Sequence, residues 1–309
     1  MESSKDDPIP LVYIGVLMLD SRFIDKHVRV IFPLPAVLFV SSLMIFPVLY
    51  TLSISFTNWN LTSGLPGRFV GIKTYLAILQ EPRFWAALWR TLYFTVLAVF
   101  IETILGMIWA LILNKEFKGK GITKLFLLMP MVSTPVAIGI SWTLFYEPTI
   151  GLANWALKLV GLPSLKWIAD PNLVIPSIIL VDVWQWTPMM ALIILAGLAG
   201  LSIEPVESAR VDGAGPFQIF RHITLPMVAP VILTAVVLRS IDALKTYDII
   251  YAMTNGGPGF ASETLNIYAY NLSFSYFRLG NAAVVLFFLF TMVMILSYIV
   301  ARMRTALEN

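Results

Sequence analysis

The chain has 309 residues, of which 58% are hydrophobic and 13% charged, and its mean hydropathy is +0.82. Because soluble domains are about half apolar and a quarter charged, this composition indicates several membrane-spanning helices. The net charge of +3, spread over many short segments, argues against nucleic-acid binding. The absence of cysteine excludes thiolate chemistry and disulfide bonds, and the two histidines, His27 and His222, are too far apart to predict a metal site.

The N-terminal segment 1–29 is predicted to hold an uncleaved helix that lies on the membrane surface. Its apolar run, Leu11–Leu19, is shorter than the roughly 20 residues needed to cross a bilayer. Arg22, Lys26 and Arg29 follow this run, whereas the positive charges of a signal peptide precede it.

Six apolar stretches then predict an all-α integral membrane protein with six transmembrane helices, an N-terminal interfacial helix and one functional loop helix. The transmembrane domain is expected to cover residues 30–303, followed by a short tail, 304–309. The predicted spans are Val30–Phe56, Thr91–Asn114, Leu125–Tyr146, Val174–Gly200, Met227 to about Met253, and Asn281–Ala301.

Basic residues give the spans an orientation. Twelve Lys and Arg residues lie in segments 1–29, 115–124, 204–226 and 302–309, against seven in the alternate loops. Since cytoplasmic loops carry the excess of Lys and Arg, the first group of segments is expected inside the cell, together with both termini.

The segment 204–226, between the fourth and fifth predicted spans, is too polar to lie in hydrocarbon. The residues from Glu207 to Val211 favour a helix, Gly213 and Gly215 interrupt it, and the residues from Phe217 to Ile223 can resume it. Two short helices that meet at a glycine corner form a compact projection which another protein could bind.

This segment also carries a recognisable pattern. Glu207-Ser208-Ala209, three residues, Gly213, nine residues and Ile223-Thr224-Leu225-Pro226 resemble the EAA loop of ABC-importer membrane subunits, with Ser208 in place of a second alanine. The resemblance implies a coupling helix that docks into a groove on a cytoplasmic ATPase, and we call 204–226 the EAA-like loop. The implied contact residues are Glu207, Ser208, Ala209, Arg210, Asp212, Gly213, Ile223, Leu225 and Pro226. The alternative is an ordinary amphipathic loop between membrane helices.

Polar residues inside the fourth and fifth spans suggest where a solute would pass. A charge at the centre of a span costs about 3 kcal/mol, so such groups are expected to face a cavity or a partner. The candidates are Asp182, Trp184, Gln185, Trp186 and Met189 in the fourth span, and Arg239, Asp242, Ala243 and Thr246 in the fifth. Polar groups beside aromatic rings suit a sugar. The alternative, that Arg239, Asp242 and Lys245 pair with one another, stays open.

The stretch Tyr247–Gly259, followed by Glu263-Thr264-Leu265, Tyr268 and Phe277–Gly280, is similar to the same region of carbohydrate-uptake permeases of the maltose and glycerol-phosphate type. This second resemblance implies a tight external turn and a downstream helix that caps the cavity.

No nucleotide-binding loop is found. The nearest match to a Walker A pattern, around Gly119-Lys120, has Asn114 in place of the first glycine and Gly121 in place of Ser or Thr. The chain itself is therefore expected to be neither an enzyme nor a cofactor-binding protein.

The resemblance implies that ATP and Mg²⁺ bind to two partner ATPase subunits. It further implies a second homologous permease subunit, an extracytoplasmic sugar-binding protein, contact with membrane lipid and no nucleic acid. The expected function is sugar import across the cytoplasmic (inner) membrane of a bacterium or archaeon. The alternative is a proton-coupled transporter with Asp182 or Asp242 as the proton carrier; such folds usually contain an inverted repeat, and we find none.

Overall fold

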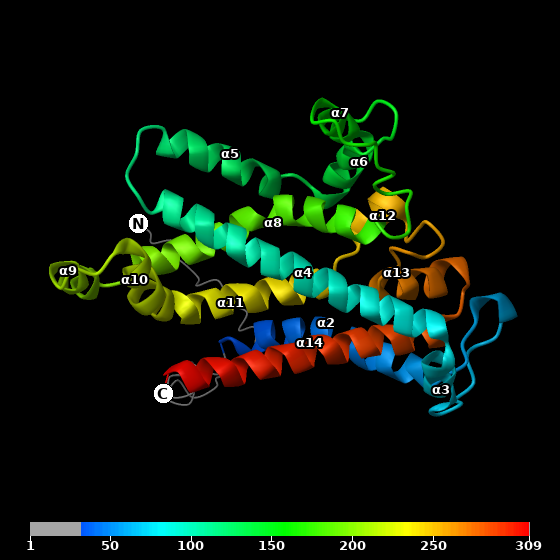
Figure 1. The fold of residues 1–309 in the computed structure, drawn as a ribbon. Coiled ribbons are helices and arrows are strands. Elements are labelled where there is room, and N and C mark those ends of the chain that lie inside the picture. The colour runs from blue at the N-terminus through cyan, green and yellow to red at the C-terminus, as the bar shows by residue number, and fades with distance from the viewer. Residues whose placement is uncertain (1–31, 309) are drawn as a thin grey trace, which may run out of the picture. The chain divides into compact units, whose positions relative to one another are not determined.

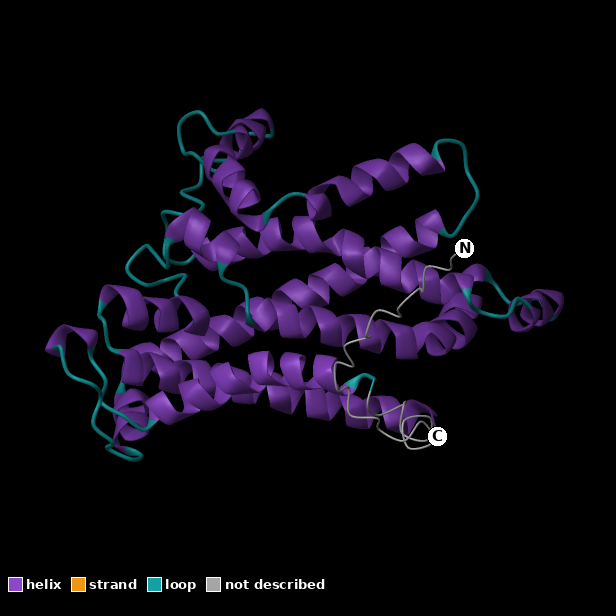
Figure 2. Ribbon diagram, turned by 180° about the vertical axis from the view of Figure 1, so that it is seen from behind, coloured by secondary structure: helices purple, strands orange, loops and turns teal. Residues whose placement is uncertain are grey.

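The computed structural model describes residues 32–308, so the predicted surface helix of residues 1–29 lies outside the described residues. The chain divides into two units, residues 1–50 and residues 51–309. Helix α2, Leu34–Ser55, crosses this boundary and corresponds to the first predicted span. Helices and loops make up the described residues (Figure 2), apart from an isolated β-bridge between Thr57 and Phe69.

Four long helices run alongside one another in the second unit (Figure 1): α4, Pro82–Leu113; α8, Val174–Ala199; α11, Leu225–Leu244; and α14, Leu279–Glu308. Helix α4 packs against α8 and α11, and α11 also contacts α8 and α14. Gly106 permits close contact between α4 and α8, because an added Cβ would lie 2.7 Å from the Met190 Cβ.

The ends of α8 agree closely with the prediction, whereas α4 begins at Pro82 rather than Thr91. Proline suits the first turn of a helix, where its missing N–H would have no helical partner. Trp85 and Trp89 in the added turns are exposed, as expected for aromatic residues at a membrane boundary.

The third predicted span is not one continuous helix. It consists of α5, Lys120–Val132, and α6, Pro135–Phe145, which are bent by 100°. Proline disfavours the helical conformation in the residue before it, and Thr134 is accordingly extended. Five helices among the described residues are long and apolar enough to cross a membrane, and the number is six if the bent pair is counted as one span. The prediction of an all-α membrane protein is thereby confirmed, with five to six candidate spans.

The fifth span is shorter than predicted, because α11 ends at Leu244 and a separate helix, α12, covers Asp248–Thr254. The 20 residues of α11 are enough to cross a bilayer. The charged residues that follow, Lys245 and Asp248, lie outside the membrane-spanning helix α11.

The connecting segments gather at opposite ends of the second unit (Figure 1). One end holds α3, Lys73–Gln80; α7, Leu152–Leu159; α12; and α13, Leu265–Tyr270. The other end holds α9, Glu204–Val211; α10, Pro216–Ile219; and the C-terminal part of α14. This separation agrees with the alternation of loops expected from the sequence.

Candidate functional site

A buried ion network joins three of the long helices. Arg239 on α11 donates from Nε to Oε2 of Glu102 on α4 at 2.7 Å, and from Nη2 to Oε1 at 3.0 Å. The same Nη2 donates to Oδ2 of Asp182 on α8. The exposed fractions of the Glu102, Asp182 and Arg239 side chains are 0%, 1% and 1%. We call these three residues the charge triad.

The charge triad shows which groups pair with Arg239, a question that the sequence left open. Arg239 does form ion pairs, but its partners are Glu102 and Asp182, whereas Asp242 pairs with Lys245 at 3.3 Å. Sequence reasoning missed Glu102, although it is the lone charged residue of the predicted span Thr91–Asn114. An ionisable residue in such a span is by itself a signal of function or of a buried partner.

The other predicted substrate residues have different environments. Gln185 is buried and donates from Nε2 to the carbonyl of Ser133, at 3.4 Å, where the third span breaks. Its Oε1 and the Oδ1 of Asp182 are buried without a hydrogen-bond partner in the described structure. Ala243 is buried, Trp184 and Asp242 are exposed, and Trp186, Met189 and Thr246 are half-buried. The structure therefore does not gather the nine residues around one open cavity.

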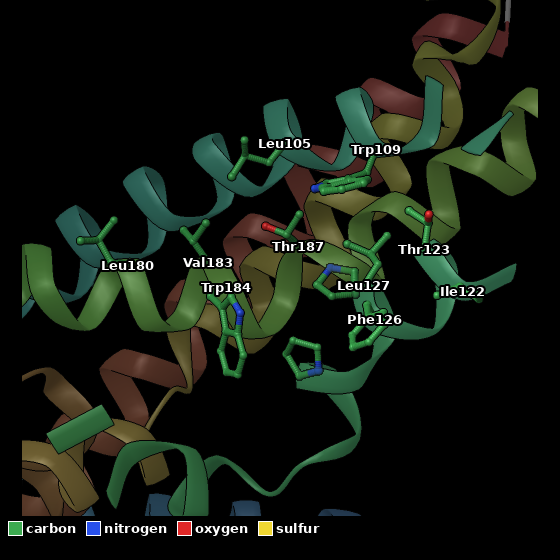
Figure 3. Close-up of a pocket in the computed structure, with 12 residues that line it drawn as sticks. Leu105, Trp109, Ile122, Thr123, Phe126, Leu127, Leu180, Val183, Trp184 and Thr187 are labelled. Atoms are coloured by element: carbon green, nitrogen blue, oxygen red, sulfur yellow. The ribbon is translucent and has the colours of Figure 1, made fainter. Parts of the chain in front are cut away.

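A cavity of about 590 Å³ lies between α4, α5 and α8. Figure 3 shows Trp109 from α4, Phe126 from α5 and Trp184 from α8 around it. Among the described residues, the hydroxyls of Thr123 and Thr187 supply the side-chain oxygens of its wall, and no charged side chain lines it. Of the predicted substrate residues, Trp184 alone lines this cavity.

The EAA-like loop forms an elbow that projects beyond the bundle (Figure 1). Helix α9 has no buried residue, and Glu207, Arg210 and Asp212 are exposed. Gly213 turns the chain with φ of 81°, a left-handed conformation that glycine adopts without strain. Ile223 lies in a π-helical turn, Phe220–Thr224, and Leu225 and Pro226 begin α11.

Sequence reasoning missed two apolar residues of the elbow. Val211 is 88% exposed and Phe217 is 71% exposed, in a segment that also carries exposed charged residues such as Glu207 and Arg210. Exposed apolar groups that adjoin polar ones are typical of a surface that contacts another protein. Their presence in a charged loop could have served as the signal.

At the opposite end, an ion pair holds the region that follows α12. Arg83 on α4 donates from Nε and Nη2 to the two carboxylate oxygens of Glu263, at 2.7 and 2.6 Å. Its guanidinium lies 3.7 Å from the centre of the Phe260 ring. Asn271 donates to the same carboxylate, and Tyr268 donates to Glu81. Burial raises the pKa of Tyr268 above its usual range, so this hydroxyl stays a donor.

Comparisons with known proteins agree with this architecture. Residues 102–308 match the family described as "Binding-protein-dependent transport system inner membrane component". The chain is 36% identical to the trehalose/maltose transport system permease protein MalF of Thermococcus litoralis, with 88% of this chain and 90% of that protein covered. It is 34% identical to the sulfoquinovosyl glycerol transport system permease protein SmoG of Agrobacterium fabrum, with 90% of both covered.

A crystal structure of a bacterial ABC transporter involved in the import of the acidic polysaccharide alginate has the same fold. The TM-score is 0.81 at 19% identity, with 94% of this chain and 99% of that chain covered.

These findings define a multi-pass permease of the inner membrane, a transport component rather than an enzyme. The chain belongs to the family of binding-protein-dependent transport system inner membrane components. The resemblance on which the sequence reasoning rested is thus confirmed, and the proton-coupled alternative loses its support.

Proposed function

We propose that this chain is the membrane subunit of an ATP-driven importer that carries an oligosaccharide, a disaccharide or a related carbohydrate to the cytoplasm. The observation that carries the proposal is the projecting elbow, whose exposed Val211 and Phe217 leave an apolar surface for a partner beside Glu207. The partners would be a second homologous permease, two ATPase subunits and an extracytoplasmic sugar-binding protein.

In this proposal the elbow transmits the movement of the ATPase subunits to the membrane-spanning helices. ATP and Mg²⁺ bind to the ATPase subunits, whose closure draws the two elbows together and opens the cavity outward; hydrolysis then resets it. Glu204 and Glu207 in the first turn of α9 and Arg210 in its last turn complement the helix dipole, which favours a stable helix for docking. Ala209 and Gly213 would allow close approach, and Pro226 would set the direction of α11.

The carbohydrate class is supported by relatives that are named for trehalose/maltose and for sulfoquinovosyl glycerol. Of the proposed substrate residues, Trp184 and Asp242 are exposed, and Trp186, Met189 and Thr246 are half-buried. The wall of the proposed sugar site would be completed by Trp186, Met189 and Ala243. The buried side chains are those of Asp182, Gln185 and Arg239, and they could reach a sugar only when the spans move apart. An aromatic ring suits the apolar face of a sugar, and carboxylate and hydroxyl groups suit its hydroxyls.

Transport into proteoliposomes tests this function. The chain and the subunits that copurify with it are reconstituted, and uptake of radiolabelled maltose and trehalose is measured with the binding protein supplied outside. We expect uptake that requires enclosed ATP and is unaffected by collapse of the proton gradient. Uptake driven by a proton gradient without ATP would contradict the proposal, and ATP-driven uptake of amino acids but of neither sugar would contradict the substrate class.

A further inference from the structure

A second cavity, of about 610 Å³, lies where the EAA-like loop meets the bundle. Its wall includes the end of α4, the end of α8 and the inner side of the elbow. We call it the elbow cavity. The proposed contact with an ATPase leaves most of this wall unexplained, because Arg210 is the one implied contact residue that also lines the cavity.

The polar part of the elbow cavity is basic. Lys115 and Arg210 line it, and none of the carboxylates that the structure describes does. Neither residue forms an ion pair with another side chain that the structure describes, whereas nearby Lys120 is paired with Glu116 at 2.8 Å. Asn114, Ser202 and Thr224 add hydrogen-bonding side chains to the same wall. Two cations without an ion-pair partner among the described side chains, beside amide and hydroxyl groups, favour a phosphate group.

The remaining wall is apolar, with Leu111, Leu198 and Phe220 among its residues. Helix α4 ends at Leu113, α8 ends at Ala199 and α11 begins at Leu225, so the cavity lies at the ends of three spans. Lipid headgroups lie at this level of a membrane protein. A phosphate ion would leave the apolar wall without a partner, whereas a phospholipid would cover it with its glycerol and acyl groups.

We propose that the elbow cavity binds one anionic phospholipid, whose phosphate lies between Lys115 and Arg210. Basic pockets between membrane helices on the cytoplasmic side are a known way to bind anionic headgroups. The lipid would connect the end of α4 to α9 and so hold the elbow at a defined angle to the bundle. This inference rests on the cavity and its charges, and it holds whatever solute the protein carries.

Native mass spectrometry of the full chain, with the subunits that copurify with it, tests the proposal. The protein is placed in nanodiscs of phosphatidylcholine mixed with phosphatidylglycerol, and the retained lipids are counted. Wild type is expected to retain phosphatidylglycerol preferentially. Lys115→Gln should lower this preference about fivefold, the size expected for one basic residue at an anionic surface. Lys115→Arg should retain the preference for phosphatidylglycerol. A loss in Lys115→Gln would then reflect the missing charge and not misfolding.

Lys118→Gln is the matched control, because Lys118 lies on the same loop and is exposed but does not line the cavity. An unchanged preference in Lys115→Gln, or an equal loss in Lys118→Gln, would overturn the proposal. Displacement of phosphatidylglycerol by inorganic phosphate at the same site would also overturn it, since the cavity would then bind a free anion.

Discussion

The charge triad allows the sharpest prediction about stability. Arg239→Ala removes the one cation that faces two carboxylates, Glu102 and Asp182, whose side chains are 0% and 1% exposed. Breaking a buried ion pair by removing one partner destabilises a protein by about 3–5 kcal/mol, because a buried charge is left without compensation. At about 2–4 °C per kcal/mol, the thermal midpoint should fall by roughly 6–20 °C.

Single neutralisation of either carboxylate should be milder. Glu102→Gln leaves Arg239 paired with Asp182, and Asp182→Asn leaves it paired with Glu102. Each change weakens one charge-assisted interaction, which is worth about 1.5–3 kcal/mol. The double variant leaves a buried guanidinium with no counter-charge, so its loss of stability should exceed the sum of the two single losses.

The assay is thermal unfolding of the purified protein in detergent, followed by fluorescence-detected size exclusion. Lys245→Ala is the matched control, because Lys245 is on the chain just after α11 and its ion pair with Asp242 is half-exposed. Such a pair contributes about 0–1 kcal/mol. If Arg239→Ala were no more destabilising than Lys245→Ala, the reasoning about the triad would be refuted.

Three further predictions concern the two ends of the molecule. Gly213→Ala should destabilise the elbow by about 1–2 kcal/mol through its left-handed backbone, seen as faster proteolysis there, and Gly213→Asn should be less affected. Glu207→Lys should abolish copurification of the ATPase subunits, while Glu204→Lys, exposed on the same helix, should retain them; equal retention would count against docking at Glu207. Arg83→Lys loses the bidentate pair with Glu263, so amide exchange in residues 256–276 should accelerate; unchanged exchange would show that the pair does not hold this region.

Local sequence features predicted much of the fold. The span ending at Ala199 and the glycine corner at Gly213 were expected from apolar length and from turn chemistry, which depend on neighbouring residues alone. The break in the third span was missed, although Pro135 lies inside the predicted span Leu125–Tyr146. Neighbouring helices often tolerate a proline in a membrane span, so the sequence did not indicate that the chain would bend by 100°.

The pairings between helices could not be predicted in the same way. Arg239 lies 137 residues from Glu102 and 57 from Asp182 along the chain, and helical periodicity does not reveal which faces of distant helices meet. Local spacing favoured Asp242 as a partner of Arg239, whereas in the structure Arg239 pairs with buried carboxylates on α4 and α8. The choice follows from solvation, because the half-exposed Asp242 is already stabilised by water and Lys245.

The most direct test of the central claim is the sidedness of the elbow. The chain contains no cysteine, so Val211→Cys introduces a single thiol at an exposed position, and Leu65→Cys does the same in the loop expected outside. An impermeant maleimide should label Leu65→Cys in intact spheroplasts, and Val211→Cys only in inverted vesicles, with labelling reduced when ATPase subunits are bound. Labelling of Val211→Cys in intact spheroplasts would contradict a cytoplasmic coupling elbow.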